Sequence, residues 1–326
     1  PPHRVSHDRV VAGAHESKGL CQHAQGRKRG MTESQTAAPA NAIEIAASGI
    51  PRQYSKVKRN KARAAALASI DSEAGAGEPY KALIINLESS IDRLQNICGH
   101  LKRADVEFER VPGLRGSDLS SYGMRRLAPN WNGVKNHLGT LGCFLGHIRA
   151  WEKVANGEGR GHLVLEDDAI PCGALPRSIS ALHIPQDFDL CFCNTRMERV
   201  FRQGETFPAH PTSFSAMEAR SSLRPTKKAI GGEAYFLSKA GAVKALQAVD
   251  RIGPFMHVDW FLFVLGIDEE AAKAFRGDDR AAQLYNRVRE QFRPVRDIEF
   301  RTIALWPALM DRARGIESTR RAENAV

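Results

Sequence analysis

The chain has 326 residues, of which 42% are hydrophobic and 26% are charged, and these ordinary proportions exclude wholesale disorder. Lys and Arg outnumber Asp and Glu by 47 to 37, so the net charge of +10 favours acidic partners such as phosphosugars, anionic lipids or nucleic acid. Six scattered cysteines exclude a disulfide-stapled scaffold and fit a reducing compartment, and no apolar run reaches the roughly 20 residues of a membrane span.

The composition of the N-terminal quarter of the chain is typical of a solvated tail. Residues 1 to 78 are rich in Ala, Ser, Gly and charge, and we predict a disordered basic extension with one short helix at 60 to 70, followed by a single domain over 79 to 326. The first 30 residues lack the apolar core of a secretory signal, and Met31 is a candidate start. A basic cluster precedes the first strand: Lys56, Lys58, Arg59, Lys61 and Arg63. We interpret this cluster as solvated, with an anionic membrane surface as the alternative partner and nucleic acid as the least favoured.

A strand, a helix and a second strand open the domain. Residues 82 to 87 form an apolar run of strand length, and Ser89 with Asp92 three residues later marks a helix start. Apolar residues follow at helical spacing: Ile91, Leu94, Cys98 and Leu101. Residues 106 to 111 then alternate between apolar and polar side chains, as in a half-buried strand.

A second core helix and two further strands follow. Apolar side chains keep helical spacing from Leu141 to Val154, and the helix is predicted to end at Asn156. Residues 162 to 165 and 188 to 193 are strand candidates. The alternation of strands and helices predicts an α/β fold with a largely parallel sheet flanked by helices, in which ligands bind beyond the carboxyl ends of the strands.

The rest of the chain is less regular. Residues 199 to 226 are polar and weakly patterned, and we expect an excursion that closes over a ligand. Residues 234 to 237 form a strand candidate, and Ser238 caps a helix that runs through Val249. The chain is then expected to be helical from Asp259 to about residue 292 and to end in a trailing tail.

Three consecutive acids at a strand end form the main candidate site. Glu166, Asp167 and Asp168 directly follow the strand at 162 to 165, and ionised carboxylates away from water are costly unless they meet a cation or hydrogen-bond donors. Their hard oxygen ligands suit Mn²⁺ or Mg²⁺, which would bridge the diphosphate of a nucleotide donor. Helix capping or a solvated turn is the alternative explanation for these acids.

Other motifs that bind nucleotides or metals are misplaced, absent or incomplete in this sequence. Gly157, Gly159 and Gly161 precede a strand, whereas the dinucleotide-binding fingerprint follows one. No G-x-x-x-x-G-K-[ST] loop and no G-x-S-x-G nucleophile elbow occur. Cys143 and His147 lie one helical turn apart, but no CxxC or HExxH motif completes a zinc site, so no structural zinc is expected.

Five blocks in order carry a resemblance: Ile85-Asn86-Leu87 with Asp92-Arg93; Leu141-Gly142-Cys143 with His147 and Trp151; Leu163 to Asp168; Gly231-Gly232 with Tyr235 and Ser238; and Val258-Asp259-Trp260. In these blocks the chain resembles glycosyltransferase family 25, the group of lipooligosaccharide and procollagen galactosyltransferases. The resemblance covers about residues 80 to 320 and includes a C-terminal stretch from Pro307 to Ser318. It implies a GT-A fold, a Mn²⁺- or Mg²⁺-dependent site, a UDP-sugar donor and inversion at the anomeric carbon.

The resemblance also implies roles for single residues on the donor side. Asp168 becomes the direct metal ligand, Glu166 and Asp167 contact the metal or the ribose, and Asn86 and Arg93 help to hold the nucleotide. A guanidinium such as that of Arg93 matches phosphate oxygens in a bidentate way, although a surface helix charge is the alternative.

On the acceptor side, the resemblance implies that Asp259 is the base that activates the acceptor hydroxyl, with Glu233 as the next candidate. Further implied substrate contacts are His147, Gly231, Gly232 and Trp260. A structural role stays open for His147, and a core role stays open for Trp260. The chain departs from the family pattern at Gly146, where a Ser usually precedes the His.

The predicted function is therefore metal-dependent, inverting transfer of a sugar from a UDP-sugar, with galactose as the family's common sugar, to a glycan or lipid-linked saccharide of the lipopolysaccharide type. We expect it in the cytoplasm, with a peripheral contact to the inner membrane through the basic extension. The alternatives are another metal-dependent nucleotidyl or phosphoryl transferase and an inactive family member that acts as a binding protein.

Overall fold

The computed structural model describes residues 63–68, 79–119, 137–201, 211–215, 230–267 and 279–313, together with residues 61, 128 and 131. These residues belong to one compact unit that spans residues 51–326. Met31 and the basic residues Lys56, Lys58 and Arg59 lie outside the described residues. None of the helices in the described part of the chain has the length and apolar character required to span a bilayer.

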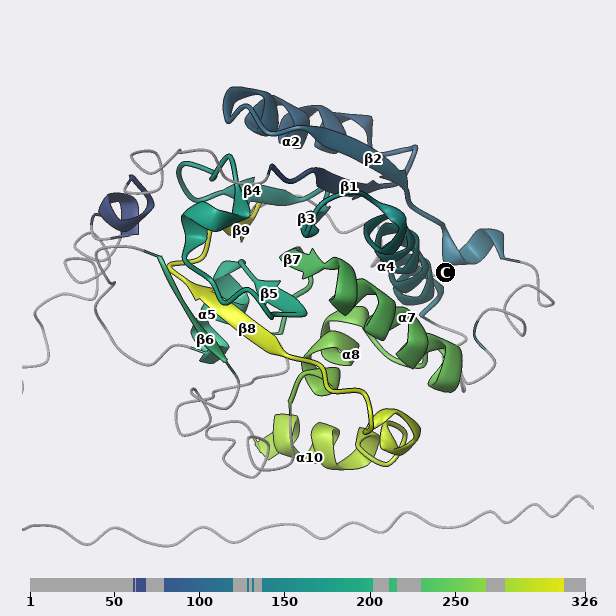
Figure 1. Ribbon diagram of the computed structural model, residues 1–326. Coiled ribbons are helices and arrows are strands. Elements are labelled where there is room, and N and C mark those ends of the chain that lie inside the picture. The colour runs from purple at the N-terminus through teal and green to yellow at the C-terminus, as the bar shows by residue number, and fades with distance from the viewer. Residues whose placement is uncertain are drawn as a thin grey trace, which may run out of the picture. The chain divides into compact units, whose positions relative to one another are not determined.

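A seven-stranded sheet organises the described residues (Figure 1). Its strands, in the order in which they lie side by side, are β2 (Phe108–Pro112), β1 (Ala82–Asn86), β3 (Gly161–Glu166), β7 (Ala234–Ser238), β5 (Leu190–Phe192), β8 (Thr302–Trp306) and β6 (Thr212–Ser215). Only β7 and β6 run against the direction of the other strands in this sheet. The predicted α/β class with a mostly parallel sheet is confirmed, and so is the β-α-β unit, because β1 and β2 pair in parallel.

Two hydrophobic cores lie on opposite faces of this sheet, because successive side chains of a strand point to opposite sides. In β1, Leu83 and Ile85 join one core and Ala82 and Ile84 join the other. The first core is covered by α4 (Leu138–Asn156), α7 (Lys239–Ile252) and α8 (Val258–Leu265), and the second by α2 (Ile91–Arg103). Figure 1 shows α4 and α7 side by side and α2 over β1 and β2. A strand that is buried on both faces has a continuous run of apolar residues, and such runs allowed these strands to be predicted from the sequence.

The helix ends follow the local sequence closely. The helix predicted to end at Asn156 does end there, and Ser238 caps α7 by accepting a hydrogen bond from the Gly241 backbone N–H at 2.9 Å. At α2 the cap residue is Ser90 rather than Ser89, and its side chain makes no capping hydrogen bond.

The C-terminal part of the chain differs from the prediction. The expected trailing tail instead supplies β8, which lies between β5 and β6, and β9 (Met310–Arg312), which pairs with β4 (Ala169–Pro171) directly after the three acids. The strand-length apolar run of β8 is buried on both faces, and burying such a run stabilises it more than a solvated tail position would.

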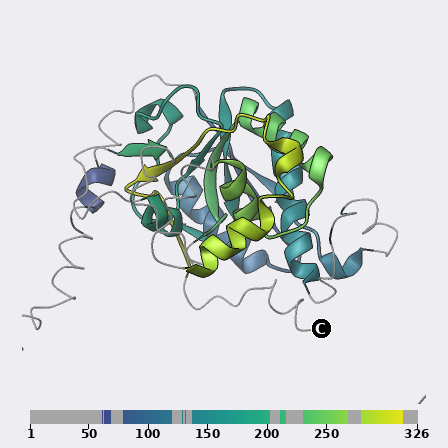
Figure 2. The same cartoon turned by 90° about the horizontal axis from the view of Figure 1, so that it is seen from below.

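Two further segments can be compared with their predictions in part. The expected excursion at 199 to 226 contains the end of α5 (Thr195–Phe201) and all of β6, and its residues 202–210 and 216–226 lie outside the description. The region expected to be helical to about 292 contains α10 (Asp279–Val288), which stands at the lower end in Figure 1 and comes to the front in Figure 2.

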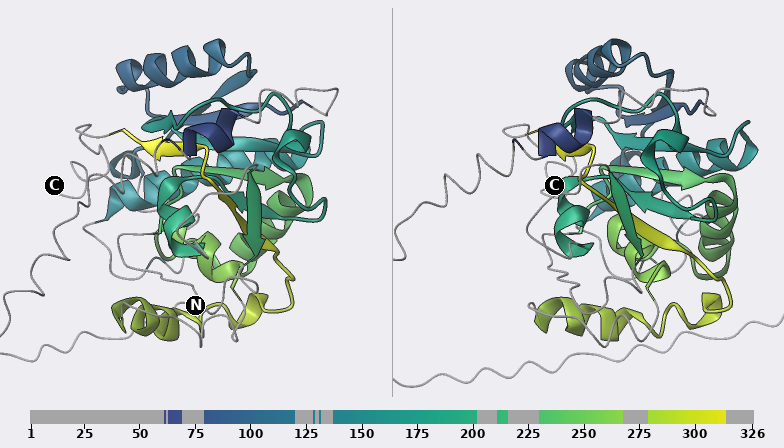
Figure 3. Two further views of the ribbon diagram at one scale, coloured as in Figure 1. Left: turned by 90° about the vertical axis from the view of Figure 1, so that its left-hand side faces the viewer. Right: turned by 60° about the vertical axis from the view of Figure 1, so that its left-hand side comes forward.

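The short helix expected at 60 to 70 is present at residues 63–68, and it is tied to the domain. Leu67 is buried in the core on the α2 side, and Figure 3 shows this purple helix beside the yellow β9. Arg63 donates to Glu198 Oε2 at 2.6 Å, and the same buried oxygen accepts from the Ala308 backbone N–H at 2.7 Å. The charge of Arg63 is therefore neutralised by Glu198 within the domain.

A shortened chain that begins at Gly77 tests where the folded domain starts. It lacks Arg63 and Leu67, and a buried carboxylate that loses its cation costs about 3 kcal/mol or more, so its melting temperature is expected to be at least about 6 °C lower than that of a chain beginning at Pro51. Glu198→Gln in the shorter chain should recover part of the loss. Equal melting temperatures would instead place the domain boundary at residue 78.

The contact between α4 and β1 explains the glycine that departs from the family pattern. A Cβ at Gly146 would lie 2.8 Å from Ile85 Cγ2, so even a small side chain would collide with this strand. The position faces β1 rather than the polar residues after β3. The departure therefore concerns the packing of α4 and leaves those polar residues unchanged.

Gly146→Ser is accordingly expected to destabilise the protein by about 1 to 3 kcal/mol, as overpacking does, even though serine is the better helix former. In an Ile85→Ala background the added cost of the serine should disappear, since the colliding methyl is gone. Gly99→Ser in α2 is the matched control, because a Cβ there meets only Arg103 Nη1 at 3.5 Å. Urea unfolding of the four variants measures the coupling, and an equal cost in both backgrounds would refute the collision.

Candidate active site

A cavity of about 90 Å³ lies beyond the carboxyl ends of β1 and β3. Acidic side chains from two segments line it: Glu166, Asp167, Asp168 and Asp259. Guanidinium groups from three further segments line it as well: Arg93, Arg196 and Arg312. The fold thus brings five of the predicted site residues, the acid triplet with Arg93 and Asp259, to one place.

Asp167 is held by a polar network behind the cavity wall. Its Oδ2 accepts from Asn86 Nδ2 at 2.8 Å, and its Oδ1 forms an ion pair with Arg93. Asn86 Oδ1 in turn accepts from Arg110 Nε at 3.1 Å. Burial raises the pKa of Asp167 to about 6, although the charge of Arg93 and the hydrogen bond from Asn86 oppose this shift. Asn86 is buried, so it acts on the cavity through Asp167.

Asp168 is the most deeply buried acid of the triplet. Its Oδ2 accepts from Arg312 Nε at 2.7 Å, and Arg93 lies 3.7 Å from the same oxygen. Its Oδ1 is buried and has no hydrogen-bond partner within the described residues. Burial raises the pKa of Asp168, and the nearby charge of Glu166 raises it further.

These features fit a divalent cation. A buried carboxylate oxygen without a partner, next to a second carboxylate whose charge disfavours its ionised form, is the situation that a hard cation relieves. Asp168 Oδ1 and Glu166 are the residues that would hold Mn²⁺ or Mg²⁺, as the sequence predicts. Arg93 and Arg312 lie beside them, and a guanidinium group can pair with two oxygens of one phosphate.

His147 lies fully buried behind Glu166. Its Nδ1 lies 2.7 Å from the Tyr235 hydroxyl, which also accepts from Trp151 Nε1 at 2.8 Å. Its Nε2 points toward Glu166 and lies 3.5 Å from Oε1. Tyr235 and Trp151, which the sequence linked to the site only through family resemblance, therefore fix the orientation of the His147 ring.

The residues that the resemblance assigns to the acceptor side lie around a buried ion pair. Glu233 is fully buried, and Arg196 Nε donates to its Oε1 at 2.9 Å. Gly231 lies where a Cβ would collide with that pair, and a Cβ at Gly232 would lie 3.5 Å from the Cβ of Asp259. Gly231 thus leaves room for the ion pair, whereas a side chain at Gly232 would meet Asp259 only at an ordinary contact distance.

Asp259 and its neighbour Trp260 have different surroundings. Asp259 is half-buried in the first turn of α8, and its Oδ1 accepts from the Trp260 backbone N–H at 2.8 Å. The Trp260 ring is 4% exposed and packs edge to face on Phe263 at 5.7 Å between centroids. Its side chain therefore lies in the core, outside the set that lines the cavity.

Sequence reasoning missed two of the three arginines. Arg196 follows the end of β5 just as the acid triplet follows the end of β3, so the polar run Asn194-Thr195-Arg196 after an apolar strand was the available signal. Arg312 lies on β9, in a stretch that resembles the end of the family, but its Arg- and Glu-rich surroundings predict a tail.

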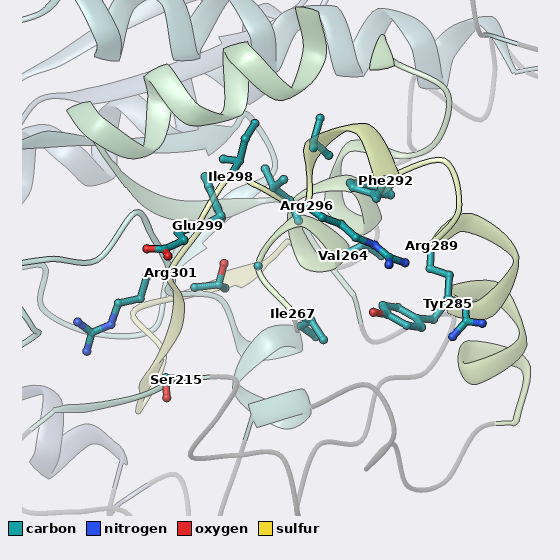
Figure 4. Close-up of a pocket in the computed structure, with 15 residues that line it drawn as sticks. Ser215, Val264, Ile267, Tyr285, Arg289, Phe292, Arg296, Ile298, Glu299 and Arg301 are labelled. Atoms are coloured by element: carbon teal, nitrogen blue, oxygen red, sulfur yellow. The ribbon is translucent and has the colours of Figure 1, made fainter. Parts of the chain in front are cut away.

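A larger cavity of about 470 Å³ lies elsewhere, between α8, α10 and β8 (Figure 4). Figure 4 shows Arg289 and Arg296 on the same side of it as Tyr285, with Phe292 close by. None of the predicted site residues lines this cavity. The four predicted acids Glu166, Asp167, Asp168 and Asp259 line the smaller cavity, whereas Glu299 lines the larger one.

Known proteins resemble this chain over part of the folded domain. The model of the family described as glycosyltransferase family 25 (LPS biosynthesis protein) matches residues 80–262. A protein of Drosophila pseudoobscura pseudoobscura named glycosyltransferase 25 family member is 29% identical over 93 residues, which cover 26% of this chain and 15% of that protein. A protein of the same name from Anopheles gambiae is 31% identical over 93 residues, which cover 26% of this chain and 16% of that protein. The chain thus spans only a small share of these relatives, but the family model covers more than half of the chain, and the chain belongs to glycosyltransferase family 25.

Proposed function

We propose that this protein transfers a sugar from a UDP-sugar donor to a hydroxyl group of a glycan or lipid-linked saccharide, with inversion at the anomeric carbon. The observation that carries the proposal is the meeting of four carboxylates and three guanidinium groups in one cavity beyond the ends of β1 and β3. Family 25 membership and the flanked, mostly parallel sheet support a transferase of the GT-A type.

The donor diphosphate would bind to the arginines. Arg93 and Arg312 each reach the cavity while paired with an aspartate, so they are positioned before a donor arrives. A guanidinium presents two parallel N–H groups to phosphate oxygens, and the low polarity of a buried site strengthens that attraction. Asp167 then remains as an acceptor for the ribose hydroxyls. The buried Glu233 keeps Arg196 aimed into the same cavity.

A divalent cation held by Asp168 and Glu166 would supply Lewis-acid stabilisation of the negative charge on the departing UDP. The chain's own contribution is to hold the two carboxylates in place. Arg312 fixes Oδ2 of Asp168, which leaves Oδ1 available, and His147 orients Glu166 from behind. Asp168 is also shielded from water, since its side chain is only 2% exposed.

Asp259 is the acceptor-side base in this proposal. The acceptor oxygen forms a bond to the anomeric carbon as the bond from that carbon to the UDP oxygen breaks, and the hydroxyl proton passes to the Asp259 carboxylate. Asp259 lines the cavity on α8, whereas the alternative base, Glu233, is buried and paired with Arg196. This difference in access favours Asp259.

The acceptor class and the site of action rest on charge. A net charge of +10 and basic residues ahead of the domain favour an acceptor displayed on an anionic surface, such as a lipid-linked saccharide at the cytoplasmic face of the inner membrane. Arg63 does not contribute to that surface, because it is paired with Glu198. The remaining basic residues supply the contact.

A donor screen with Mn²⁺ tests both the activity and the metal site. UDP release from at least one UDP-sugar is expected, and Asp168→Asn should lower turnover by roughly a hundredfold or more, because a focused electrostatic contact is lost. Asp250→Asn, on the exposed face of α7, is the matched control and should behave as wild type. Full turnover in Asp168→Asn, with Mn²⁺ dependence unchanged, would rule out the ligand assignment.

Asp259→Asn separates the acceptor base from a donor ligand. A base acts only on the attacking hydroxyl, so UDP should bind with near-normal affinity while transfer slows by about a hundredfold or more. If UDP affinity collapses while transfer at saturating donor stays near normal, Asp259 belongs to the donor site instead.

A further inference from the structure

A second, chemically different set of ligand atoms lies against the acid triplet. Cys143 and His147 are four residues apart on α4, so their side chains lie on one face of the helix, and that face meets Glu166 at the end of β3. One ligand atom from each of these residues lies within 4.8 Å of the others. Sequence spacing could not reveal this set, because the third member comes from a strand.

The separations match a tetrahedral zinc ion. Zinc bonds of about 2.0 Å to nitrogen, about 2.1 Å to oxygen and about 2.3 Å to sulfur imply ligand separations of about 3.4 Å between nitrogen and oxygen and about 3.6 Å between sulfur and oxygen. Here His147 Nε2 lies 3.5 Å from Glu166 Oε1, and Cys143 Sγ lies 4.0 Å from the same oxygen. Only the thiol must approach, by a small rotation of a half-buried side chain.

The buried histidine supplies an independent indication. His147 is fully buried, and its Nε2 has no hydrogen-bond partner within the described residues although it points at Glu166. Its other nitrogen is engaged by the Tyr235 hydroxyl at 2.7 Å. A metal-binding histidine almost always uses its second nitrogen in this way, since that contact fixes the tautomer and the orientation of the ring.

We propose that Cys143, His147 and Glu166 bind one Zn²⁺ ion, and that zinc bound there withdraws Glu166 from the donor site. Thiolate and imidazole ligands select zinc over manganese and magnesium, whereas the oxygen ligands around Asp168 have the opposite preference. Cys143 and Glu166 both line the 90 Å³ cavity, which gives zinc a way in and leaves a fourth position for water. Glu166 is a ligand both of the proposed zinc site and of the proposed Mn²⁺ or Mg²⁺ site with Asp168. Zinc that binds Glu166 would therefore remove it from the second site and inhibit the protein.

The zinc site itself is independent of the proposed function, whereas the inhibition rests on it. Binding is therefore measured first, without any sugar. Co²⁺ replaces Zn²⁺ in the full-length protein and reports a bound thiolate through a sulfur-to-cobalt charge-transfer band in the near ultraviolet. One equivalent of Co²⁺ should produce the band, and one equivalent of Zn²⁺ should abolish it.

Matched variants assign the ligands. Cys143→Ser should remove the band, while Cys98→Ser, which changes a half-buried thiol on α2, should keep it. Tyr235→Phe keeps the ring but removes the hydroxyl that orients His147, and should weaken zinc binding by about tenfold to a hundredfold. Equal melting temperatures of Cys143→Ser and Cys98→Ser would confirm that loss of the band is not loss of the fold.

Two outcomes would overturn the site: no charge-transfer band in the wild-type protein at saturating Co²⁺, or a band that survives in Cys143→Ser. Inhibition is measured separately, as Zn²⁺ titration of Mn²⁺-supported UDP release, where Cys143→Ser should need at least about tenfold more zinc. A cobalt band without any UDP release would keep the zinc site and refute the proposed function. Release that zinc inhibits equally in both proteins would refute the coupling through Glu166.

Discussion

The carboxylates gathered after β3 are the constraint on which the rest of the structure depends. A carboxylate that leaves water is strongly destabilising unless a cation or donors replace the solvent, so Asp167 and Asp168 can be buried only with partners. Their cationic partners come from outside the central strands, because Arg93 lies on α2 and Arg312 lies on β9. The placement of α2 and of the last strand is therefore an electrostatic requirement as well as a matter of apolar packing.

A second buried acid also requires a cation, and this cation comes from the N-terminal side of the domain. Glu198 on α5 accepts from Arg63, which lies 135 residues earlier, and from the backbone of Ala308. The short helix at 63–68 is thereby joined to both α5 and the segment between β8 and β9. Sequence composition alone assigns this region to a solvated tail, since a single buried arginine and Leu67 leave little trace among many Ala and charged residues.

Local pattern predicted the elements that bury continuous apolar runs, such as β1 and β3, and the helix ends with clear signals, such as Ser238. It also placed the acid triplet at a strand end, because that follows from sequence order. What pattern could not supply was the pairing of distant segments. Arg312 and Arg196 acquire their roles only through tertiary contacts with acids far away in sequence, and the Cys143 and His147 pair gains Glu166 in the same way.

The position of β8 and β9 has a consequence for how the protein matures. The Arg312 to Asp168 contact spans 144 residues, and β8 must enter the sheet between β5 and β6, so the last described segment completes both the sheet and the polar cavity. Contacts of such long sequence separation form late, because the loop that they close must be ordered first. On the ribosome, Arg93 emerges before the acids after β3, whereas Arg312 emerges 144 residues after Asp168, so Asp168 at first has only one of its two arginines. The polar cavity is therefore complete only after β8 has entered the sheet and β9 has brought Arg312 to Asp168.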